Sequence, residues 1–215
     1  MEESTNREKV LKKIRASLLS KTDNPFPRLS FEGSVFPAIE DDILVHFAER
    51  AEEAGARFFL IDNELDFMEA IVQLGLQYKW KHILCAEEGL SNLLTECELP
   101  HSHNTADIAD MEVAISTCEC LIARTGSVVF SSSGQTRSVP AFAPFHIVLG
   151  KASHICPDIK DAMAWVRHKF PRLPGNLSIV TGTSSTADID GDVVRGVHGP
   201  VKLYIFVIDD RDQTP

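Results

Sequence analysis

Hydrophobic residues near the start of the chain follow the spacing of an amphipathic helix. From Thr5 to Leu19, apolar residues recur on one face and charged residues fill the other, and Thr5 and Glu8 have the spacing of a capping box. The apolar residues of this face are Val10, Leu11, Ile14 and Leu18. Prolines and aromatic residues follow, as in a connector. We therefore expect a helix and connector over residues 1–36 and one α/β domain over residues 37–215.

From residue 41 the pattern alternates between helical spacing and short apolar runs. The runs that predict strands are residues 56–61, 82–86, 146–150, 177–181 and 201–207. Strands separated by helices imply a parallel sheet with crossover helices. Between residues 112 and 131 the strand-like runs leave no room for a helix between them. The predicted fold class is α/β, with a parallel sheet, crossover helices, a β-rich central excursion and an N-terminal helical arm.

Charge and composition exclude several classes of partner. The 215 residues contain 21 Lys and Arg against 31 Asp and Glu, and this net charge of −10 opposes binding to nucleic acid or to an anionic membrane. The first residues are polar and acidic, unlike a signal peptide, and no apolar stretch reaches the roughly 20 residues of a membrane span. Five cysteines at irregular spacing do not form a disulfide framework. We expect a cytoplasmic protein that binds small molecules or proteins.

Two polar loops are candidates for a ligand site because each follows a strand that should be buried. They cover residues 124–137 and 181–200. In open α/β sheets, ligands gather beyond the carboxyl ends of the strands, which favours the loop after Thr181. Gly182 permits close backbone approach, and the neighbouring hydroxyls suit an anion such as phosphate or a carboxylate. The alternative interpretation is that these Ser and Thr residues only make turns and helix caps.

Short motifs in and between these loops are similar to those of a known family. They are Thr125-Gly126, Gly134-Gln135, Arg137, Pro144, His146-Ile147, Gly182, Ser184, Thr186 to Ile189 and Gly196 to Pro200. In this order they resemble the LUD domain family of lactate utilization proteins over most of residues 112–207. The resemblance implies a NagB/RpiA/CoA-transferase-like fold. It also implies that the protein is a component of a lactate utilization system. Such a system oxidises lactate to pyruvate with the help of iron–sulfur partner proteins.

Two other functions stay open beside this one. Relatives by fold act on phosphorylated or acyl-thioester small molecules, so a stand-alone enzyme of that class is one alternative. A non-catalytic assembly factor, whose loops make protein contacts, is the other. We expect no cofactor, no nucleic acid and no membrane insertion, and a homo-oligomer stays open.

The predicted ligand site is an anion-binding cleft built from both loops. Its residues are Arg124, Thr125, Gly126, Gly134, Gln135, Arg137, Thr181, Gly182, Ser184 and Thr186. The chain departs from the family pattern where Arg124 replaces Glu, Thr136 replaces Gly and Ser185 replaces Arg. One positive charge is thus gained in the first loop and one is lost in the second. Our hypothesis is that Arg124 and Arg137 together supply the charge that holds the anion.

Two residues are candidates for acid–base chemistry. His198 lies in the turn before the last strand, where an imidazole can exchange a proton near neutral pH or can lock the two loops together. Asp188 can cap a short helical turn or can orient His198. His146 opens a buried strand, which favours a structural role over a functional one.

Paired cysteines and histidines suggest a metal site, but their spacing argues against one. Cys118 and Cys120 are separated by a single residue, as are His101 and His103. Structural zinc sites normally use pairs spaced by two to four residues, and iron–sulfur clusters need more thiolates at tighter spacings. We therefore predict no metal site.

Overall fold

The computed structural model describes residues 5–19, 25–26, 36–104, 108–133, 139–189, 192–196 and 199–211, without the side chains of residues 140–141, 186–189 and 192–195. The chain divides into two units, residues 1–38 and residues 39–215. Among the helices of the described residues, none combines the length and the apolar character that crossing a membrane requires.

Helix α1 (Asn6–Leu19) in the first unit begins with the expected capping box. The Thr5 N–H donates to the Glu8 carboxylate at 2.9 Å, and the Glu8 N–H donates to the Thr5 hydroxyl at 3.3 Å. The predicted apolar face is present, but its side chains are exposed, from 41% for Leu11 to 70% for Leu18. Helix α1 therefore buries none of its own residues.

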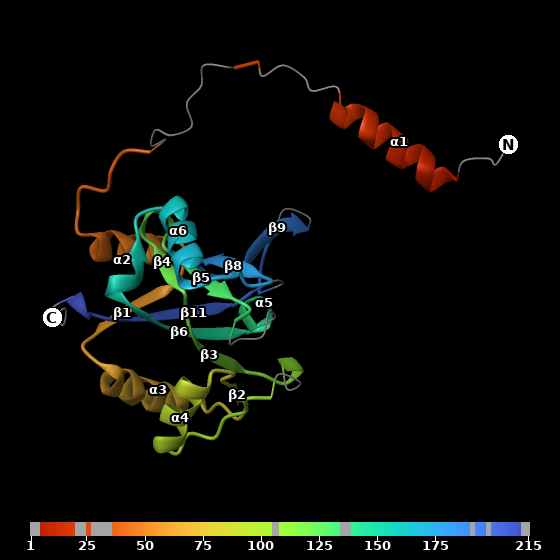
Figure 1. The fold of residues 1–215 in the computed structure, drawn as a ribbon. Helices are drawn as coiled ribbons and strands as arrows, with labels where there is room; N and C mark the ends of the chain where they lie inside the picture. Colours follow the sequence, from red (N-terminus) through yellow and green to blue (C-terminus); the bar gives the residue numbers. More distant parts are fainter. Residues whose placement is uncertain are drawn as a thin grey trace. The chain divides into compact units, whose positions relative to one another are not determined.

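The second unit is built on a five-stranded sheet, as the alternating pattern predicts (Figure 1). The strands lie in the order β1-β11-β6-β3-β2, and every neighbouring pair is parallel. Their bounds are β1 (Arg57–Ile61), β2 (Ile83–Leu84), β3 (Val113–Thr117), β6 (Phe145–Lys151) and β11 (Lys202–Ile208). The central strands β3, β6 and β11 are nearly continuous runs of buried residues, which is typical of a parallel sheet covered on both faces.

Helices α3 (Glu64–Tyr78) and α4 (Glu88–Glu96) cover one face of this sheet (Figure 1). Apolar side chains of both helices form one buried cluster with those of β3, β6 and β11. In this cluster Phe206 stacks on Phe59, with 4.6 Å between ring centroids, and meets the edge of Phe67 at 5.3 Å. These contacts fix α3 against the centre of the sheet.

Asn63 caps α3. Its side-chain oxygen accepts the N–H groups of Leu65 at 2.8 Å and Asp66 at 3.1 Å. Because Asn63→Ala leaves these donors without the cap, we expect it to lower the free energy of unfolding by about 1 kcal/mol. Urea denaturation followed by circular dichroism measures the change. The control Asn92→Ala, on an exposed position of α4, should change stability by less than about 0.5 kcal/mol. An Asn63→Ala protein as stable as the wild type would contradict the capping role.

Helix α2 (Ile43–Glu53) and a second sheet cover the opposite face. The second sheet has the order β7-β4-β5-β8, in which β4 is parallel to β7 and the other pairs are antiparallel. Its strands are β4 (Cys120–Ile122), β5 (Ser127–Ser131), β7 (Ile155–Cys156) and β8 (Leu177–Thr181). Phe47 of α2 and Phe130 of β5 pack in one buried cluster with Leu203 of the first sheet. Helix α6 (Ile159–Lys169) packs on the far side of the second sheet.

The α/β class, the parallel sheet and the β-rich excursion are confirmed, but two expectations about the last third of the chain were wrong. Residues 177–181 do not extend the parallel sheet, because β8 pairs antiparallel with β5 at the edge of the second sheet. Its residues are half-buried or exposed, as on an edge strand with one covered face. The chain around Asp188 forms a strand rather than a helical turn.

The remaining short elements are η2 (Ala123–Thr125), α5 (Val139–Phe142), η3 (Ala152–His154), β9 (Ser185–Ile189) and β10 (Asp192–Arg195).

Candidate functional site

The start of the first polar loop, residues 124–126, meets the second polar loop at one end of the second sheet. Because β5 and β8 are antiparallel, the residues before β5 lie beside the residues after β8, and Ser127 is paired with Thr181 in the strand register. The loop after β8 lines a cavity of about 190 Å³ together with the segment that leads into β11. The lining residues are Ile179, Val180, Thr181, Gly182, Thr183, Ser184, Gly199 and Pro200. Five of the predicted site residues, Thr125, Gly126, Thr181, Gly182 and Ser184, are therefore brought together.

A chain of hydroxyl groups joins the two loops. The Thr125 and Ser127 hydroxyl oxygens are 2.6 Å apart, and the Ser127 and Thr181 hydroxyl oxygens are 2.7 Å apart. Ser127 is buried, whereas Thr125 and Thr181 are exposed. Ser127 was not among the predicted site residues, because its central place depends on the register between β5 and β8.

Ser184 ties the loop after β8 to the segment before β11. Its N–H donates to the Pro200 carbonyl at 2.8 Å, and its carbonyl accepts the Gly196 N–H at 3.2 Å. These two backbone hydrogen bonds hold together two of the motifs that the sequence singled out, although they are twelve or more residues apart. Ser184 also lines the cavity, so its predicted place in the site is compatible with its position.

Gly126 and Gly182 both rest against the carboxyl end of α2. Both have a positive φ, +60° and +63°, which glycine adopts without strain. A Cβ atom at Gly126 would lie 2.2 Å from the backbone nitrogen of Ala51, and one at Gly182 would lie 1.8 Å from the carbonyl oxygen of Ala54. The close backbone approach expected at Gly182 therefore occurs toward α2. The Thr183 N–H extends this contact by donating to the Ala54 carbonyl at 3.3 Å.

Arg124 is directed toward helix α6. Its Nε donates to a carboxylate oxygen of Asp158 at 2.8 Å, and its backbone N–H donates to the Pro157 carbonyl at 3.2 Å. Asp158 also caps α6 by accepting the Ile159 N–H at 2.6 Å. Arg124 thus helps to hold the first loop on the start of α6.

The other predicted site residues are only partly covered by the structure. Gly134, Gln135, Arg137 and His198 lie outside the described residues. Thr186 and Asp188 belong to β9, which pairs antiparallel with β10, and only their backbone is described. The predicted pairing of Asp188 with His198 and the anion-binding role of Arg137 stay hypotheses.

His146 is fully buried between the two sheets. Its Nε2 is 2.8 Å from the Ser116 hydroxyl, and its ring stacks on Phe130 at 5.1 Å between centroids. Its Nδ1 has no hydrogen-bond partner among the described residues. Burial lowers the pKa of His146 from 6.5 to about 4, so the imidazole is neutral at physiological pH. A neutral ring packed in a core is consistent with the structural role that the sequence favours.

Cysteines and histidines do not gather around a common point in the described part of the chain. No group of three or more His, Cys, Asp or Glu side chains there could hold a metal ion. Burial raises the pKa values of Cys85 and Cys118 to about 12, so both thiols stay protonated at neutral pH. His101 uses Nδ1 to donate to the Leu99 carbonyl at 2.8 Å, and its Nε2 is 2.7 Å from the Ser91 hydroxyl.

Comparisons with known proteins agree with the resemblance seen in the motifs. The family model of the LUD domain matches residues 78–208. Lactate utilization protein C of Bacillus licheniformis is 33% identical over 142 residues, which cover 58% of this chain and 59% of that protein. Lactate utilization protein C of Shouchella clausii is 28% identical over 183 residues, which cover 80% of this chain and 77% of that protein.

A solved structure supports the fold. A DUF162 family protein from Deinococcus radiodurans superposes with a TM-score of 0.59 at 18% sequence identity, covering 80% of this chain and 99% of that chain. The LUD match spans more than half of the chain and includes both polar loops, the antiparallel strands that join them and the last strand of the parallel sheet. The chain belongs to the LUD domain family.

Proposed function

We propose that this protein is a component of a lactate utilization system and that it binds a small carboxylate anion where the two polar loops meet. The observation that carries the proposal is the hydroxyl chain of Thr125, Ser127 and Thr181 beside the cavity of about 190 Å³. The names of the relatives, lactate utilization protein C, supply the class of ligand.

Among the described residues, the hydroxyl chain keeps one hydrogen-bond donor without an acceptor. Each hydroxyl carries one proton, so three hydroxyls linked by two hydrogen bonds keep one proton for a further acceptor. Because Ser127 is buried in the middle, that donor lies at Thr125 or at Thr181, and Thr181 lines the cavity. A carboxylate is a good acceptor for such a donor, since charge-assisted hydrogen bonds are stronger than neutral ones.

The positive charge for this anion is assigned to Arg137. Arg124 and Arg137 both belong to the first loop, and the Nε of Arg124 donates to Asp158. Arg137 follows β5 in the sequence and belongs to the motifs that resemble the LUD family. It is the second of the two arginines that we expect to hold the anion. An arginine suits this role because its planar guanidinium binds carboxylates through two parallel hydrogen bonds.

Isothermal titration calorimetry with L-lactate and pyruvate tests the carboxylate site. We expect Thr181→Val, which removes only the hydroxyl, to weaken binding by about fivefold or more, and Arg137→Ala by about tenfold or more. Thr181→Ser keeps the hydroxyl and should bind as the wild type does. Arg167→Ala, on an exposed position of α6, is the charge control. Unchanged affinity in both Thr181→Val and Arg137→Ala would remove the proposed site.

The proposal also includes iron–sulfur partner proteins. Proteins that co-purify with the tagged full-length chain from lactate-grown cells are expected to contain stoichiometric iron, while the chain itself contains none. If no iron-containing protein is retained under these conditions, the proposed assembly is contradicted. The chain would then be a carboxylate-binding protein that acts without iron–sulfur partners. Thermal stabilisation by coenzyme A or by sugar phosphates, without stabilisation by lactate or pyruvate, would instead favour the enzyme alternative.

A further inference from the structure

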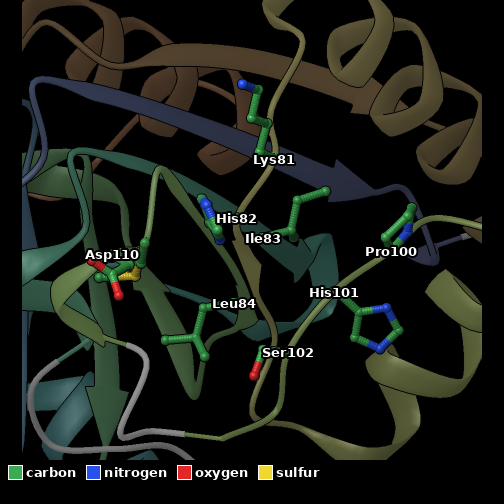
Figure 2. Close-up of a pocket in the computed structure, with 9 residues that line it drawn as sticks. Lys81, His82, Ile83, Leu84, Pro100, His101, Ser102 and Asp110 are labelled. Carbon is green, nitrogen blue, oxygen red and sulfur yellow. The ribbon is translucent and has the colours of Figure 1, made fainter.

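The two edge strands of the five-stranded sheet, β1 and β2, differ in how their outer sides are covered. The chain segment at Ser102 runs along the outer side of β2 (Figure 2). There the Ser102 N–H donates to the Ile83 carbonyl at 2.8 Å, and the Ser102 carbonyl accepts the Cys85 N–H at 2.9 Å. Strand β1 pairs with β11 on its inner side, and no strand of the described residues pairs with its outer side. Such an uncovered edge is a template for pairing with a further strand.

The hydrogen bonds between β1 and β11 show which backbone groups of β1 face outward. The Ile61 carbonyl accepts the Asp209 N–H at 2.9 Å, so Ile61 turns its N–H and C=O groups toward β11. Phe59, two residues earlier, does the same, because successive residues of a strand alternate in this direction. Phe58 and Leu60 therefore turn their N–H and C=O groups away from the sheet.

Only the middle of this outer edge is open within the described residues. At one end, the Ala56 N–H donates to the Ala51 carbonyl at 3.0 Å. At the other end, the Asp62 N–H donates to a carboxylate oxygen in the first turn of α3 at 3.1 Å. Between them, the N–H and C=O groups of Phe58 and Leu60 have no hydrogen-bond partner in the part of the chain that the structure describes. Leu60 is also 50% exposed, although it lies within a strand.

Strand β1 lacks the features that keep exposed sheet edges unpaired. Its sequence, Arg-Phe-Phe-Leu-Ile, contains no proline, and its register with β11 runs without a bulge. Its one charged side chain, Arg57, stands at the first residue of the strand. Natural proteins protect exposed edges with prolines, bulges or inward-pointing charges. An apolar edge without them indicates that another strand pairs with it.

The open stretch of β1 is complementary to itself. When two copies pair antiparallel around Phe59, Phe58 lies opposite Leu60 of the partner subunit, and the same pair recurs on the other side of the two-fold axis. Each pair exchanges two N–H···O=C hydrogen bonds, so all the open backbone groups of both copies are used. The neighbouring alignments would place Phe58 opposite Asp62 or Leu60 opposite Ala56, whose N–H groups already have acceptors. The free groups thus select one register.

The side chains favour the same antiparallel arrangement. Phe58 and Leu60 lie on one face of β1, so each Leu60 packs against Phe58 of the partner subunit, an aromatic–aliphatic pair that stabilises sheets. Arg57 lies on the opposite face, with its guanidinium over the Tyr204 ring at 5.6 Å from the centroid. Antiparallel pairing places Arg57 at the same end of the sheet as the acidic first turn of the partner's α3. Parallel pairing would instead place the two arginines side by side, which like charges oppose.

We propose that this protein forms a two-fold symmetric dimer in which the β1 strands of two copies pair antiparallel around Phe59. The pairing joins the two five-stranded sheets into one continuous sheet. Because it uses the same open edge on both copies, the assembly closes at two subunits and does not grow into a filament. The dimer goes beyond the proposed carboxylate site and does not depend on it.

Sedimentation equilibrium of the full chain tests for the dimer. We expect the wild type to change from the mass of one chain at about 1 μM toward twice that mass at about 100 μM. Leu60→Pro removes an N–H that the β1–β11 ladder does not use, so it should weaken dimerisation by about tenfold or more while the circular dichroism spectrum stays that of the wild type. A wild type that remains a monomer at about 100 μM would overturn the proposal.

A second variant covers the case in which proline disturbs the strand. Leu60→Lys keeps the backbone N–H but brings two ammonium groups to the pairing edge, so it should also weaken dimerisation by about tenfold or more. The matched control is Leu173→Lys, at a residue that is 48% exposed and lies outside the five-stranded sheet. It should dimerise as the wild type does. Dimerisation that is unchanged in both Leu60 variants would exclude the β1 edge as the interface.

Amide hydrogen exchange followed by NMR locates the interface. At a concentration where the wild type is dimeric, the Phe58 amide should exchange about tenfold or more slowly than in Leu60→Lys, because the dimer gives it an acceptor. The Phe59 and Ile61 amides already bond to β11 and should exchange at similar rates in both proteins. A dimer in which the Phe58 amide exchanges as fast as in Leu60→Lys would use another surface and would contradict the proposed pairing.

Discussion

Gly182→Ala is expected to lower the free energy of unfolding by about 3 kcal/mol or more. The added Cβ would lie 1.8 Å from the Ala54 carbonyl oxygen and 2.5 Å from its carbonyl carbon, and both atoms belong to backbone that cannot rotate away. A positive φ adds about 1–2 kcal/mol for a residue with a side chain, and overpacking adds about 1–3 kcal/mol. Relief of the clash would move the loop after β8 away from α2, so the carboxylate affinity should fall as well.

Urea denaturation of matched glycine variants measures this effect. Gly126→Ala should behave like Gly182→Ala, because its Cβ would lie 2.2 Å from the Ala51 nitrogen. Gly89→Ala is the control, since Gly89 lies in α4 and a Cβ there would have no atom within 4 Å. We expect this control to be stabilised by about 0.5–1 kcal/mol, because alanine is the better helix former. A Gly182→Ala protein as stable as the wild type would show that the loop does not depend on α2.

His146 is expected to make the protein lose stability as the pH falls from neutral toward 5. In the folded protein its pKa is about 4, compared with an ordinary value of 6.5, so between these values the unfolded chain takes up a proton that the folded protein does not. The stability contribution is therefore complete above pH 6.5 and falls as the pH falls. Linkage gives a loss of about 2 kcal/mol between pH 7 and pH 5 from this residue.

The measurement compares the wild type with His146→Gln at both pH values. Glutamine keeps a polar group toward the Ser116 hydroxyl but replaces the buried ring, so we expect the variant to be less stable than the wild type at both pH values. Because glutamine does not titrate, the variant should lack the pH dependence that His146 causes in this window. The wild type should lose about 2 kcal/mol more than the variant between pH 7 and pH 5. Other histidines and carboxylates are common to both proteins and cancel in the comparison. Equal losses would show that His146 is not buried as a neutral ring.

Local spacing predicted those parts of the fold that depend on neighbouring residues. The capping box at Thr5 and Glu8 formed because its two hydrogen bonds lie within one helical turn. The parallel sheet was predictable because helices between apolar runs leave the strands no other connection. Strand β8 was misassigned, because a short apolar run does not say which of two sheets it will join.

The candidate site was predictable only in part, because its geometry depends on long-range pairing. The motifs singled out Thr125 and Thr181, and the structure links their side chains through Ser127, whose place between them follows from the β5–β8 register. The contact of Gly182 with α2 joins residues more than a hundred positions apart, which no local pattern encodes.

Helix α2 supports the turns at Gly126 and Gly182, and this contact affects where the smallest folding unit of the chain begins. The LUD family match starts at residue 78, after α2 and β1. A fragment of residues 78–208 would lack the helix end against which Gly126 and Gly182 rest, and β11 would lose its pairing with β1 over Tyr204 to Ile208. We therefore expect the smallest piece of this chain that folds on its own to start near residue 39, where the second unit begins. The sequence-defined domain is thus shorter than the physical one.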